Sequence, residues 1–523
     1  MSIPAHACIV IGAGHNGLVC AATLARSGRS VLVLEAGGQV GGAAATRAFA
    51  PGFQVSACAH LLHLMPAELL RDLKLEQHGL EWAAQGLPTT ALVAGAAPLA
   101  MPQAGASPGL SPKDAAAYAQ YRARMLRFAA TLAPVLGTAP PRLGTEAWAD
   151  RLALARVGWQ IRKLGRRDMR ELLRIGAMNV YDLLEEHFES AALKGALGFD
   201  AVLGTNFGPR SPGTVLTLLY RLAAEHAGAG ADAGALAQPR GGLGALSAAL
   251  ARAATAAGAT VRTGAAVAGI LVEDDRVSGV VLETGERIAA RTVISNADPK
   301  TTFLRLLGAR HLDTGFVRRV SHLRSQGLAA KLHLAIDRLP RFTGLEASRL
   351  GGRLLIAPSL GYLEHAYNHA KYGEFSAAPA VEITVPTVND PSLAPAGKHV
   401  LSAIVQYAPY ALKRGWDGAR QRFTDLAIDT IEQFAPGLRA SIVGAELLTP
   451  VDLEREFRIS GGHWHHGELA FDQFFLVRPV PGATQYRTPV EGLFLCGAGC
   501  HPGGGVMGIA GRNAARQVLK QVA

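Results

Sequence analysis

The chain has 523 residues, and at that length a single hydrophobic core no longer keeps growing, so two or more domains are expected. Hydrophobic residues make up 49% of the chain and charged residues 18%, which excludes a disordered protein. The net charge is +11 at pH 7, but no basic stretch accompanies a nucleic-acid-reading motif, so nucleic acid is not expected as a partner.

The absence of recognisable targeting signals and the cysteine usage predict a cytoplasmic protein. The chain has no stretch of roughly 18 apolar residues free of Gly, Pro and charge, and its N-terminal segment is typical of a strand rather than a signal peptide. Its five cysteines, an odd number scattered along the chain, argue against a disulfide framework and for a reducing compartment. We therefore expect neither export nor a transmembrane helix.

Residues 7–36 have the pattern of one complete βαβ unit. Cys8–Ile11 and Ser30–Leu34 are short apolar runs suited to buried parallel strands, and Leu18–Arg26 between them is predicted to be helical. In the GxGxxG motif of dinucleotide-binding proteins, the first glycine permits a tight turn, the second lets the backbone approach a pyrophosphate and the third allows close packing of helix on strand. The turn after the first strand carries glycines at this spacing: Gly12, Gly14 and Gly17.

An acidic residue ends the second predicted strand. Glu35 stands at the interval after Gly17 where a carboxylate accepts hydrogen bonds from a ribose diol and disfavours a 2′-phosphate. The free N–H groups and the dipole at the N-terminus of the intervening helix favour a pyrophosphate anion. Strands, helix, glycines and acid together predict a dinucleotide site.

The C-terminal segment predicts a second contact with the dinucleotide. Leu493–Cys496 has the pattern of a strand, Gly497–Gly505 of a glycine-rich loop, and the residues from Val506 onward of a helix. A helix N-terminus aimed at an electron-rich group stabilises negative charge that builds up there. In the middle of the chain, Leu243–Ala257 is predicted as a helix and Thr292–Ser295 as a buried strand. No second GxGxxG unit appears, which argues against a separate NAD(P)H domain.

Longer motifs identify a family. With the segments GHNGLV (14–19), VGGAAATR (40–47), PGFQVS (51–56), LTPVDLEREF (448–457), DQFFLVRPVP (472–481) and HPGGGVMGIAGRNAA (501–515), nearly the whole chain resembles the phytoene desaturase-related branch of the FAD-dependent amine oxidase superfamily. The resemblance implies FAD as the cofactor. It also implies an α/β fold, with a Rossmann-type FAD-binding domain and a discontinuous α+β substrate or cap domain.

The resemblance implies a division of the chain and a set of cofactor contacts. Residues 1–85, 238–310 and 485–523 correspond to the FAD-binding domain, and residues 86–237 and 311–484 to the substrate or cap domain. Ala43 replaces a basic residue and Ala498 an Asp that many relatives carry, so only backbone roles are expected at these two positions. The residues expected at the FAD are Gly12, Gly14, Asn16, Gly17, Glu35, Ala36, Gly41, Gly42, Ala43, Val267, Gly497, Ala498, Gly505, Val506 and Met507.

The densest basic run covers residues 151–174, where arginines alternate with leucines, an isoleucine and a tryptophan. This pattern predicts an amphipathic helix that is compatible with lying on a membrane. A solvated helix face in an ordinary domain accounts for the same pattern. Peripheral membrane contact therefore stays open as one of two interpretations.

The segment GGHWHHGELAFDQ, residues 461–473, places three histidines and a tryptophan in four consecutive positions. The histidine spacing lacks the i, i+4 pairing of a helical metal site, and no cysteine lies near, so no metal is expected. If the segment is extended, His463 and His465 share one face and His466 the other.

Two histidines are candidates for acid–base chemistry, because imidazole titrates near neutral pH. His466 matches a histidine of the resembled family, and His501 is expected near the flavin ring. A hydrogen-bonded histidine that only shapes a pocket is the alternative for His466. Asp472 and Arg478 form either a structural ion pair or part of a site. The residues expected to line a substrate pocket are His463, Trp464, Gln473 and Arg478.

The simplest interpretation is an FAD-dependent desaturase or dehydrogenase that removes hydride from an apolar, polyene-like or lipid-like substrate. The cap domain is expected to supply a largely apolar pocket, since hydride transfer needs a close, oriented and dry substrate. Oxygen, a quinone or another acceptor is expected to reoxidise the flavin. A redox-neutral isomerase that shifts a double bond and a flavoprotein scaffold with little catalysis are the alternatives.

Overall fold

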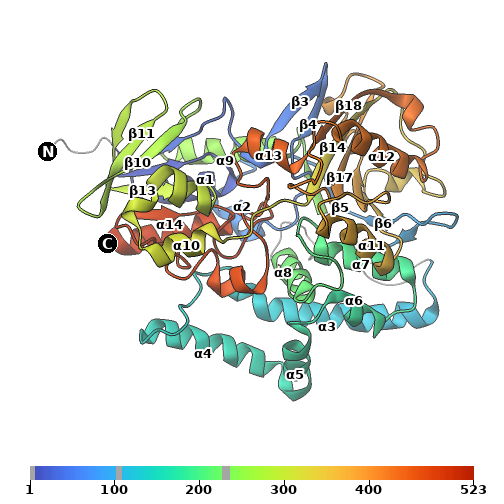
Figure 1. Cartoon of the computed structure of the whole chain (residues 1–523), viewed down its shortest axis with the longest axis horizontal. Coiled ribbons are helices and arrows are strands. Elements are labelled where there is room, and N and C mark those ends of the chain that lie inside the picture. Colours follow the sequence, from blue (N-terminus) through green and yellow to red (C-terminus); the bar gives the residue numbers. More distant parts are fainter. Residues whose placement is uncertain (1–5, 102–108, 227–235, 523) are drawn as a thin grey trace.

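The computed structural model describes residues 6–101, 109–226 and 236–522. Figure 1 shows two β-sheet regions side by side, with a group of helices along one edge of the molecule. The fold class is α/β, as predicted.

The first sheet is parallel and is assembled from distant segments, in the order β19-β13-β1-β2-β9. β1, β2 and β13 are buried along their whole length, which explains why they are continuous apolar runs in the sequence. α1 packs against α9 and α14 on this sheet. The bounds are β1 Cys8–Ile11, β2 Val31–Leu34, β9 Thr260–Arg262, β13 Thr292–Ser295, β19 Leu493–Leu495, α1 His15–Arg26, α9 Leu243–Ala256 and α14 Ile509–Val522.

Two of these helices begin at residues other than those predicted. α1 begins at His15 rather than Leu18, because the glycine turn ends at Gly14 and helical geometry starts directly after it. α14 begins at Ile509 rather than Val506, because Val506 and Gly508 have φ values of +57° and +70°, which a right-handed helix does not contain. The C-terminal loop is therefore longer than predicted.

The second large sheet has seven strands in the order β18-β14-β17-β16-β15-β6-β7. Its strands pair antiparallel, except that β15 and β6 are parallel. β14, at the junction of β17 and β18, is buried at every position. The bounds are β6 Thr89–Ala91, β7 Leu99–Ala100, β14 Ala329–Ile336, β15 Arg353–Ile356, β16 Val381–Thr384, β17 His399–Gln406 and β18 Ile442–Leu448.

Smaller sheets and helices connect and cover these two sheets. The antiparallel sheet β10-β11-β12 flanks the first large sheet, and the pairs β3-β4 and β5-β8 link the two regions. Their bounds are β3 Thr46–Ala50, β4 Phe53–Ser56, β5 Trp82–Leu87, β8 Leu236–Pro239, β10 Val267–Glu273, β11 Arg276–Leu282 and β12 Arg287–Ala289. The remaining helices are α2 Ala67–Asp72, α3 Pro112–Leu136, α6 Val180–Glu185, α7 Ala191–Val202, α8 Thr214–His226, α10 Thr314–Ser321, α11 Leu360–Lys371, α12 Arg420–Glu432 and α13 Pro450–Phe457.

The basic run at residues 151–174 forms two helices, not the single helix predicted. α4 (Trp148–Lys163) and α5 (Gly165–Ile175) meet at Gly165, whose φ of +82° ends the first helix. Both lie at the lower edge of Figure 1, away from the two sheets. Among the described residues, no helix combines the length and apolar character that crossing a bilayer requires.

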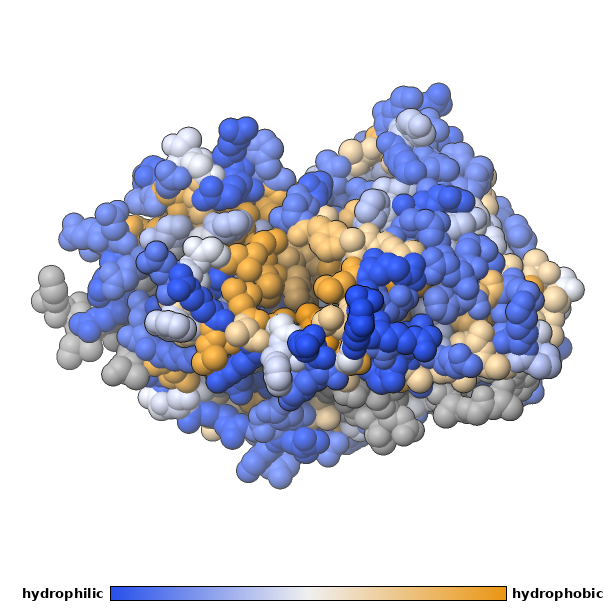
Figure 2. Space-filling view, turned by 90° about the horizontal axis from the view of Figure 1, so that it is seen from below, coloured by the Kyte–Doolittle hydropathy of each residue, from blue (hydrophilic) through white to orange (hydrophobic). Residues whose placement is uncertain are grey.

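Apolar side chains reach the surface in some places. On the face shown in Figure 2, hydrophobic residues gather in a central hollow bordered by hydrophilic ones. Contiguous apolar surface of this kind is typical of places where proteins bind other molecules. Exposed large hydrophobic side chains also occur in and next to α4 and α5: Leu143, Trp148, Leu152, Trp159 and Leu173.

The packing of α14 on α1 depends on Gly511. A Cβ added there would lie 2.0 Å from the backbone oxygen of Asn16, so Gly511→Ala must push the two helices apart. We expect a loss of about 2–3 kcal/mol in stability, seen as a lower thermal unfolding midpoint by circular dichroism. Gly158→Ala is the matched control, because this glycine of α4 has no neighbouring atom within 4 Å of an added Cβ. Equal midpoints for the two variants would contradict this account of the α1–α14 contact.

Candidate functional site

A large cavity lies where the glycine turn meets the carboxyl ends of the first sheet's strands. Its volume is about 940 Å³. Here it is called the dinucleotide cavity. α1 begins at its edge with Gly14 as N-cap, and no side chain caps the first N–H groups of the helix. The residues predicted at the cofactor that line it are Gly12, Gly14, Asn16, Glu35, Ala36, Gly41, Gly42, Ala43, Val267 and Ala498.

Glu35 lies at the end of β2 with its carboxylate held by the backbone. Oε2 accepts a hydrogen bond from the N–H of Ala13 at 2.7 Å, and Oε1 accepts one from the N–H of Gly37 at 2.8 Å. Each oxygen retains a second lone pair for another donor. This orientation suits a carboxylate that receives a ribose hydroxyl.

Orphaned polar atoms beside the dinucleotide cavity indicate that a polar molecule belongs there. His15 Nε2, Asn16 Oδ1 and His466 Nδ1 are buried and have no hydrogen-bond partner, and all three residues line the cavity. A buried polar atom without a partner costs about 1–3 kcal/mol, so such atoms in one cavity point to a ligand that pairs with them. Uncapped helix amides, the Glu35 carboxylate and these atoms fit the phosphates, ribose and ring system of FAD.

The remaining predicted cofactor residues take other positions. Gly17 and Gly497 serve packing: an added Cβ would lie 2.1 Å from the Gly12 oxygen and 2.6 Å from the Asn296 oxygen, respectively. Met507 is buried, and the Tyr220 hydroxyl donates to its Sδ at 3.6 Å. Gly505 and Val506 line a different cavity.

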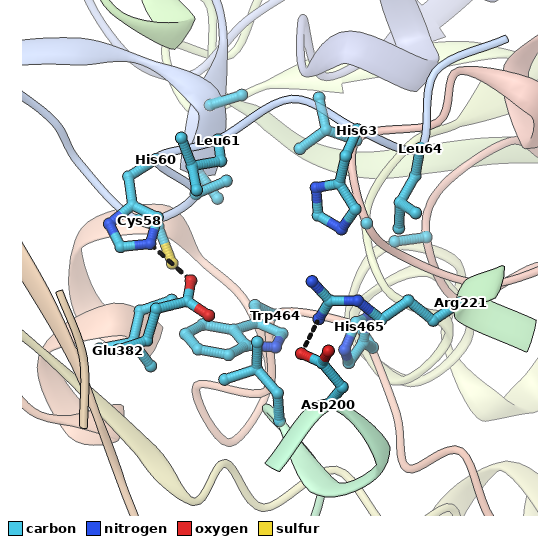
Figure 3. A pocket seen from close by; sticks show the side chains of 18 of the residues that line it. Cys58, His60, Leu61, His63, Leu64, Asp200, Arg221, Glu382, Trp464 and His465 are labelled. Atoms are coloured by element: carbon cyan, nitrogen blue, oxygen red, sulfur yellow. Dashed lines mark hydrogen bonds and ion pairs between the residues drawn. The ribbon is translucent and has the colours of Figure 1, made fainter. Parts of the chain in front are cut away.

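This second cavity, the inner cavity, has a volume of about 160 Å³. It shares four lining residues with the dinucleotide cavity, so the two cavities meet at a common wall. Apolar side chains such as Leu61 and Leu64 form much of its surface (Figure 3). The residues of the shared wall are His15, Ala43, Trp464 and Ala498.

A chain of buried charges lines another side of the inner cavity (Figure 3). His60 Nε2 lies 2.7 Å from Oε1 of Glu382, and Arg353 Nε donates to Oε2 of the same carboxylate at 2.5 Å. Arg353 also donates to Asp200 at 2.6 Å, and Arg221 lies 3.5 Å from the same oxygen of Asp200. Burial raises the pKa of Glu382, but the Arg353 guanidinium and the His60 ring outweigh it and hold that pKa well below its usual range.

The sequence offered little to indicate this charged wall. Asp200 is on α7, Arg221 on α8, Arg353 on β15 and Glu382 on β16, so only the tertiary fold brings them together. The one local signal is the HLLH pattern at 60–63, because both of its histidines line the inner cavity. The predicted largely apolar pocket thus has one strongly polar side.

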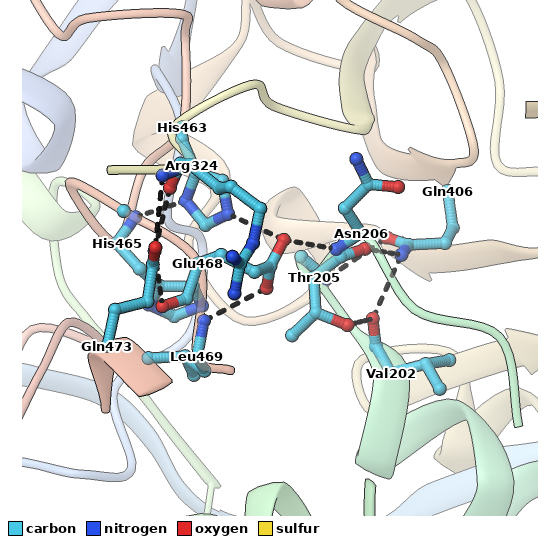
Figure 4. Close-up of polar contacts among 12 residues, drawn as sticks. Val202, Thr205, Asn206, Arg324, Gln406, His463, His465, Glu468, Leu469 and Gln473 are labelled. Carbon is cyan, nitrogen blue, oxygen red and sulfur yellow. Dashed lines mark hydrogen bonds and ion pairs between the residues drawn. The ribbon is translucent and has the colours of Figure 1, made fainter. Parts of the chain in front are cut away.

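Residues 461–469, the histidine loop, form a turn rather than the extended segment considered above. The N–H of His466 donates to the backbone oxygen of His463 at 2.7 Å, and His466 has a φ of +57°. Figure 4 shows Glu468 anchoring the loop by accepting hydrogen bonds from the N–H groups of Asn206 at 2.7 Å and Leu469 at 3.0 Å. The turn places Trp464 in the shared wall, His465 in the inner cavity and His466 in the dinucleotide cavity.

The other predicted pocket residues, His463, Gln473 and Arg478, line neither cavity. His463 is 1% exposed, with Nε2 3.4 Å from Glu468. Gln473 hydrogen-bonds the backbone N–H and oxygen of Arg324 at 3.0 and 2.8 Å (Figure 4). Arg478 is 1% exposed and donates to backbone oxygens of the histidine loop and of Ala498. These three residues therefore support the cavity walls through hydrogen bonds without lining either cavity.

Two further expectations are changed by the structure. Asp472 pairs with Arg324, not with Arg478, so the predicted alternative of an Asp472–Arg478 ion pair is wrong. His501 is fully buried and lines neither cavity, and its two ring nitrogens lie 3.0 and 2.9 Å from the backbone oxygens of Phe475 and Val135. This placement favours a structural role for His501.

Within residues 6–101, 109–226 and 236–522, no group of three or more His, Cys, Asp or Glu side chains is arranged to hold a metal ion. All five cysteines are buried and free, and burial raises the pKa of Cys58, which lines the inner cavity, to about 12. A neutral buried thiol of this kind is a poor nucleophile.

Known proteins resemble this chain, some of them along nearly all of its length. Residues 17–519 match the family described as flavin containing amine oxidoreductase. Pyridine nucleotide-disulfide oxidoreductase domain-containing protein 2 of Rattus norvegicus is 38% identical over 99% of this chain and 94% of its own. A neurosporene-forming phytoene desaturase of Cereibacter sphaeroides is 29% identical over 52% of this chain and 51% of its own. Cyclohexylamine oxidase from Brevibacterium oxydans superposes with a TM-score of 0.59 at 19% identity, over 99% of this chain and 100% of that one.

Filling the glycine turn tests the dinucleotide cavity. A Cβ at Gly14 would lie 2.8 Å from the Asn296 side chain, and the branches of valine would extend over the uncapped amides of α1. We expect Gly14→Val to weaken FAD binding at least about tenfold, measured as the flavin absorbance retained per protein after reconstitution. Gly38→Val is the control, because nothing lies within 4 Å of its added Cβ. Full flavin content in Gly14→Val would contradict the assignment.

The buried histidines make stability depend on pH. Desolvation lowers the pKa of His466 from 6.5 to about 4, so the folded protein resists protonation of this ring. The unfolded chain binds that proton near pH 6.5, and stability therefore falls as the pH drops from 6.5 toward 4. Between pH 7 and pH 5 this one ring lowers stability by about 2 kcal/mol.

His466→Asn removes this pH dependence, and asparagine tolerates the left-handed backbone at the position. We expect the fall in thermal unfolding midpoint from pH 7 to pH 5 to be smaller in this variant than in the unmodified protein. His322→Asn, which replaces an exposed histidine, should retain the full fall. A fall of the same size in both variants would count against the effect.

Proposed function

Because the chain belongs to the flavin containing amine oxidoreductase family, we propose that it is an FAD-dependent oxidoreductase that takes hydride from the carbon framework of a substrate in the inner cavity. FAD and a general oxidoreductase activity follow from the family. The observation that carries the finer proposal is the wall shared by the two cavities at His15, Ala43, Trp464 and Ala498. A flavin held on one side of that wall and a substrate on the other are neighbours.

The chain's own residues account for cofactor binding. The uncapped N–H groups of α1 receive the pyrophosphate, and Glu35 receives the ribose hydroxyls. The left-handed backbone of Gly41, with a φ of +116°, turns the chain along the cavity wall. When bound, FAD supplies a two-electron acceptor for hydride. His466, which lines this cavity, is proposed as a neighbour of the flavin ring rather than as a proton carrier, because its pKa is far below neutral.

The inner cavity positions the substrate and excludes water from it. Its apolar walls exclude water and hold a carbon chain near the shared wall, which favours hydride transfer. The Trp464 ring is fixed in that wall by close packing, since a Cβ added at Gly204 would lie 2.2 Å from its Nε1. His465 Nδ1 is buried without a partner beside this space, and burial lowers the pKa of this ring well below its usual range. The neutral ring therefore acts as a hydrogen-bond partner for a substrate.

A carbon framework as the site of oxidation has support from two sides. The similar protein from Cereibacter sphaeroides is named as a phytoene desaturase, and a desaturase oxidises a carbon–carbon bond. The shared wall has small apolar side chains at Ala43 and Ala498, which leave room for a carbon chain close to the flavin. Desaturation or dehydrogenation is accordingly the proposed reaction class.

Anaerobic mixing of the FAD-loaded protein with a panel of lipids tests the proposal. We expect at least one compound to bleach the flavin absorbance, and oxygen or a quinone to restore it. Trp464→Ala should slow the bleaching at least about tenfold when the rate is compared per bound flavin, because substrate positioning alone contributes large rate factors. Trp148→Ala removes a surface tryptophan, 81% exposed, and should have no effect.

Two outcomes would contradict the proposal. A double-bond shift without consumption of any electron acceptor would indicate a redox-neutral isomerase. A flavin that photoreduces yet responds to no compound, together with a protein that co-purifies stably, would indicate a scaffold role.

A further inference from the structure

A third cavity, the distal cavity, continues from the inner cavity away from the shared wall. Its volume is about 130 Å³. The two cavities have Asp200, Arg221, Leu236 and Arg353 in common, so they meet at the chain of buried charges. Much of the distal cavity is apolar, with Leu87, Met101, Met125, Leu126, Leu197 and Leu222 among its lining residues.

The chain of buried charges is complete in itself. Lys331 Nζ lies 2.7 Å from His60 Nδ1, and the other nitrogen of the His60 ring contacts Glu382, so the ring connects Lys331 to that carboxylate. At the other end, Arg221 Nε donates to Glu225 at 3.0 Å. Two arginines thus alternate with three carboxylates in the order Glu382, Arg353, Asp200, Arg221 and Glu225. Buried charges require such pairing, and this chain needs no ligand to supply it.

Arg122 is a further cation of the distal cavity, and it does not belong to the row of paired charges described above. It is on α3, is half-buried and hydrogen-bonds the side chain of Tyr118. Among the described residues it forms no ion pair. An arginine that lines an apolar cavity without a carboxylate partner favours an anion from outside the chain.

Tyr121, the neighbour of Arg122, adds a hydroxyl group in the same cavity. Tyr121 is 5% exposed, lines the distal cavity, and its hydroxyl has no hydrogen-bond partner. Its ring is held edge-on to those of His187 and Phe188, with centroids 5.3 and 5.2 Å apart, so its orientation is fixed by packing. A buried hydroxyl without an acceptor is a cost that a bound ligand relieves.

We propose that the substrate is an amphipathic carboxylic acid, whose carboxylate binds Arg122 and Tyr121 in the distal cavity while its apolar chain extends through the inner cavity to the wall at Trp464 and Ala498. The guanidinium and the hydroxyl both donate to the carboxylate oxygens. The paired charges of Asp200, Arg221 and Arg353 border the path of the chain without attracting the carboxylate. This inference rests on the proposed function and adds the chemical class of the substrate.

Binding of matched probes tests this class independently of turnover. A series of saturated and unsaturated fatty acids from octanoate to oleate is compared with the alcohols of the same chains. The FAD-loaded protein is titrated, and binding is read from intrinsic tryptophan fluorescence and from calorimetry. We expect at least one acid to bind about tenfold or more tightly than its alcohol, because the charge-assisted contact is lost in the alcohol.

Variants locate the carboxylate contact. Arg122→Gln should remove the preference for the acid while leaving the affinity for the alcohol unchanged. Tyr121→Phe should reduce the affinity for the acid by a few fold, and the thermal midpoint should not fall, since the lost hydroxyl has no partner. Arg127→Gln is the matched control on the same helix, because Arg127 is exposed and pairs with Asp168 outside the cavities. If Arg122→Gln loses its folded structure by circular dichroism, Arg122→Lys should keep the charge and the preference.

Each adverse result has a distinct meaning. Equal affinity for acids and alcohols, no binding of any acid, or an unchanged preference in Arg122→Gln and Tyr121→Phe would overturn the carboxylic acid proposal. Flavin bleaching by an uncharged lipid in the same protein would do so while leaving the oxidoreductase proposal intact. Tight binding of an acid that never bleaches the flavin would instead count against the oxidoreductase proposal and leave the carboxylate site standing.

Discussion

The uncapped amino end of α1, at the carboxyl edge of the parallel sheet, is the constraint on which the rest of the site depends. Its first N–H groups have no side-chain partner, and close packing at Gly17 and Gly511 fixes the helix against the glycine turn and α14. Parallel strands from three separate stretches of the chain must converge for this edge to exist, because β1, β2, β13 and β19 all end there. An anion-binding helix end and a cavity large enough for a dinucleotide follow from that one arrangement.

The wall between the dinucleotide and inner cavities is made by segments with unusual backbone conformations. Val506 in the C-terminal loop and His466 in the histidine loop both have a φ of +57°. Arg478 holds the two loops together by donating hydrogen bonds to backbone oxygens of both. Left-handed residues other than glycine are found where tertiary contacts outweigh their local cost of about 1–2 kcal/mol. The backbone hydrogen bonds of Arg478 are such contacts, and they position Trp464 and Ala498 as neighbours.

Buried charge distinguishes the inner cavity from a purely hydrocarbon-binding pocket. Each member of the Glu382–Arg353–Asp200–Arg221 chain has a charged or hydrogen-bonding partner on both sides, so removing one member leaves its neighbours with one partner fewer, and the members support each other's positions. The chain therefore works as a rigid polar border between the inner and distal cavities. Because its charges are already paired, the polarity available to a ligand lies with Arg122 and Tyr121. With apolar walls next to the dinucleotide cavity and hydrogen-bond donors at the far end, the site suits a molecule with two chemically different ends.

Local residue order accounts for the βαβ unit at the dinucleotide edge, whereas the convergence of β13 and β19 on that edge and the whole substrate side were decided by tertiary packing. Gly12, Gly14, Glu35 and the strands around them lie within one βαβ unit, where backbone conformation and strand period act over short distances, and the two strands were predicted to within one residue. The family resemblance was confirmed, and it could be recognised from the sequence because its motifs are contiguous segments. The break at Gly165, the late start of α14 and the turn at His466 depend on left-handed backbone that no periodicity reveals. The inner and distal cavities take His60, Arg122, Asp200, Arg221, Arg353 and Glu382 from segments far apart in the chain, and only side chains packed in three dimensions determine which charges meet.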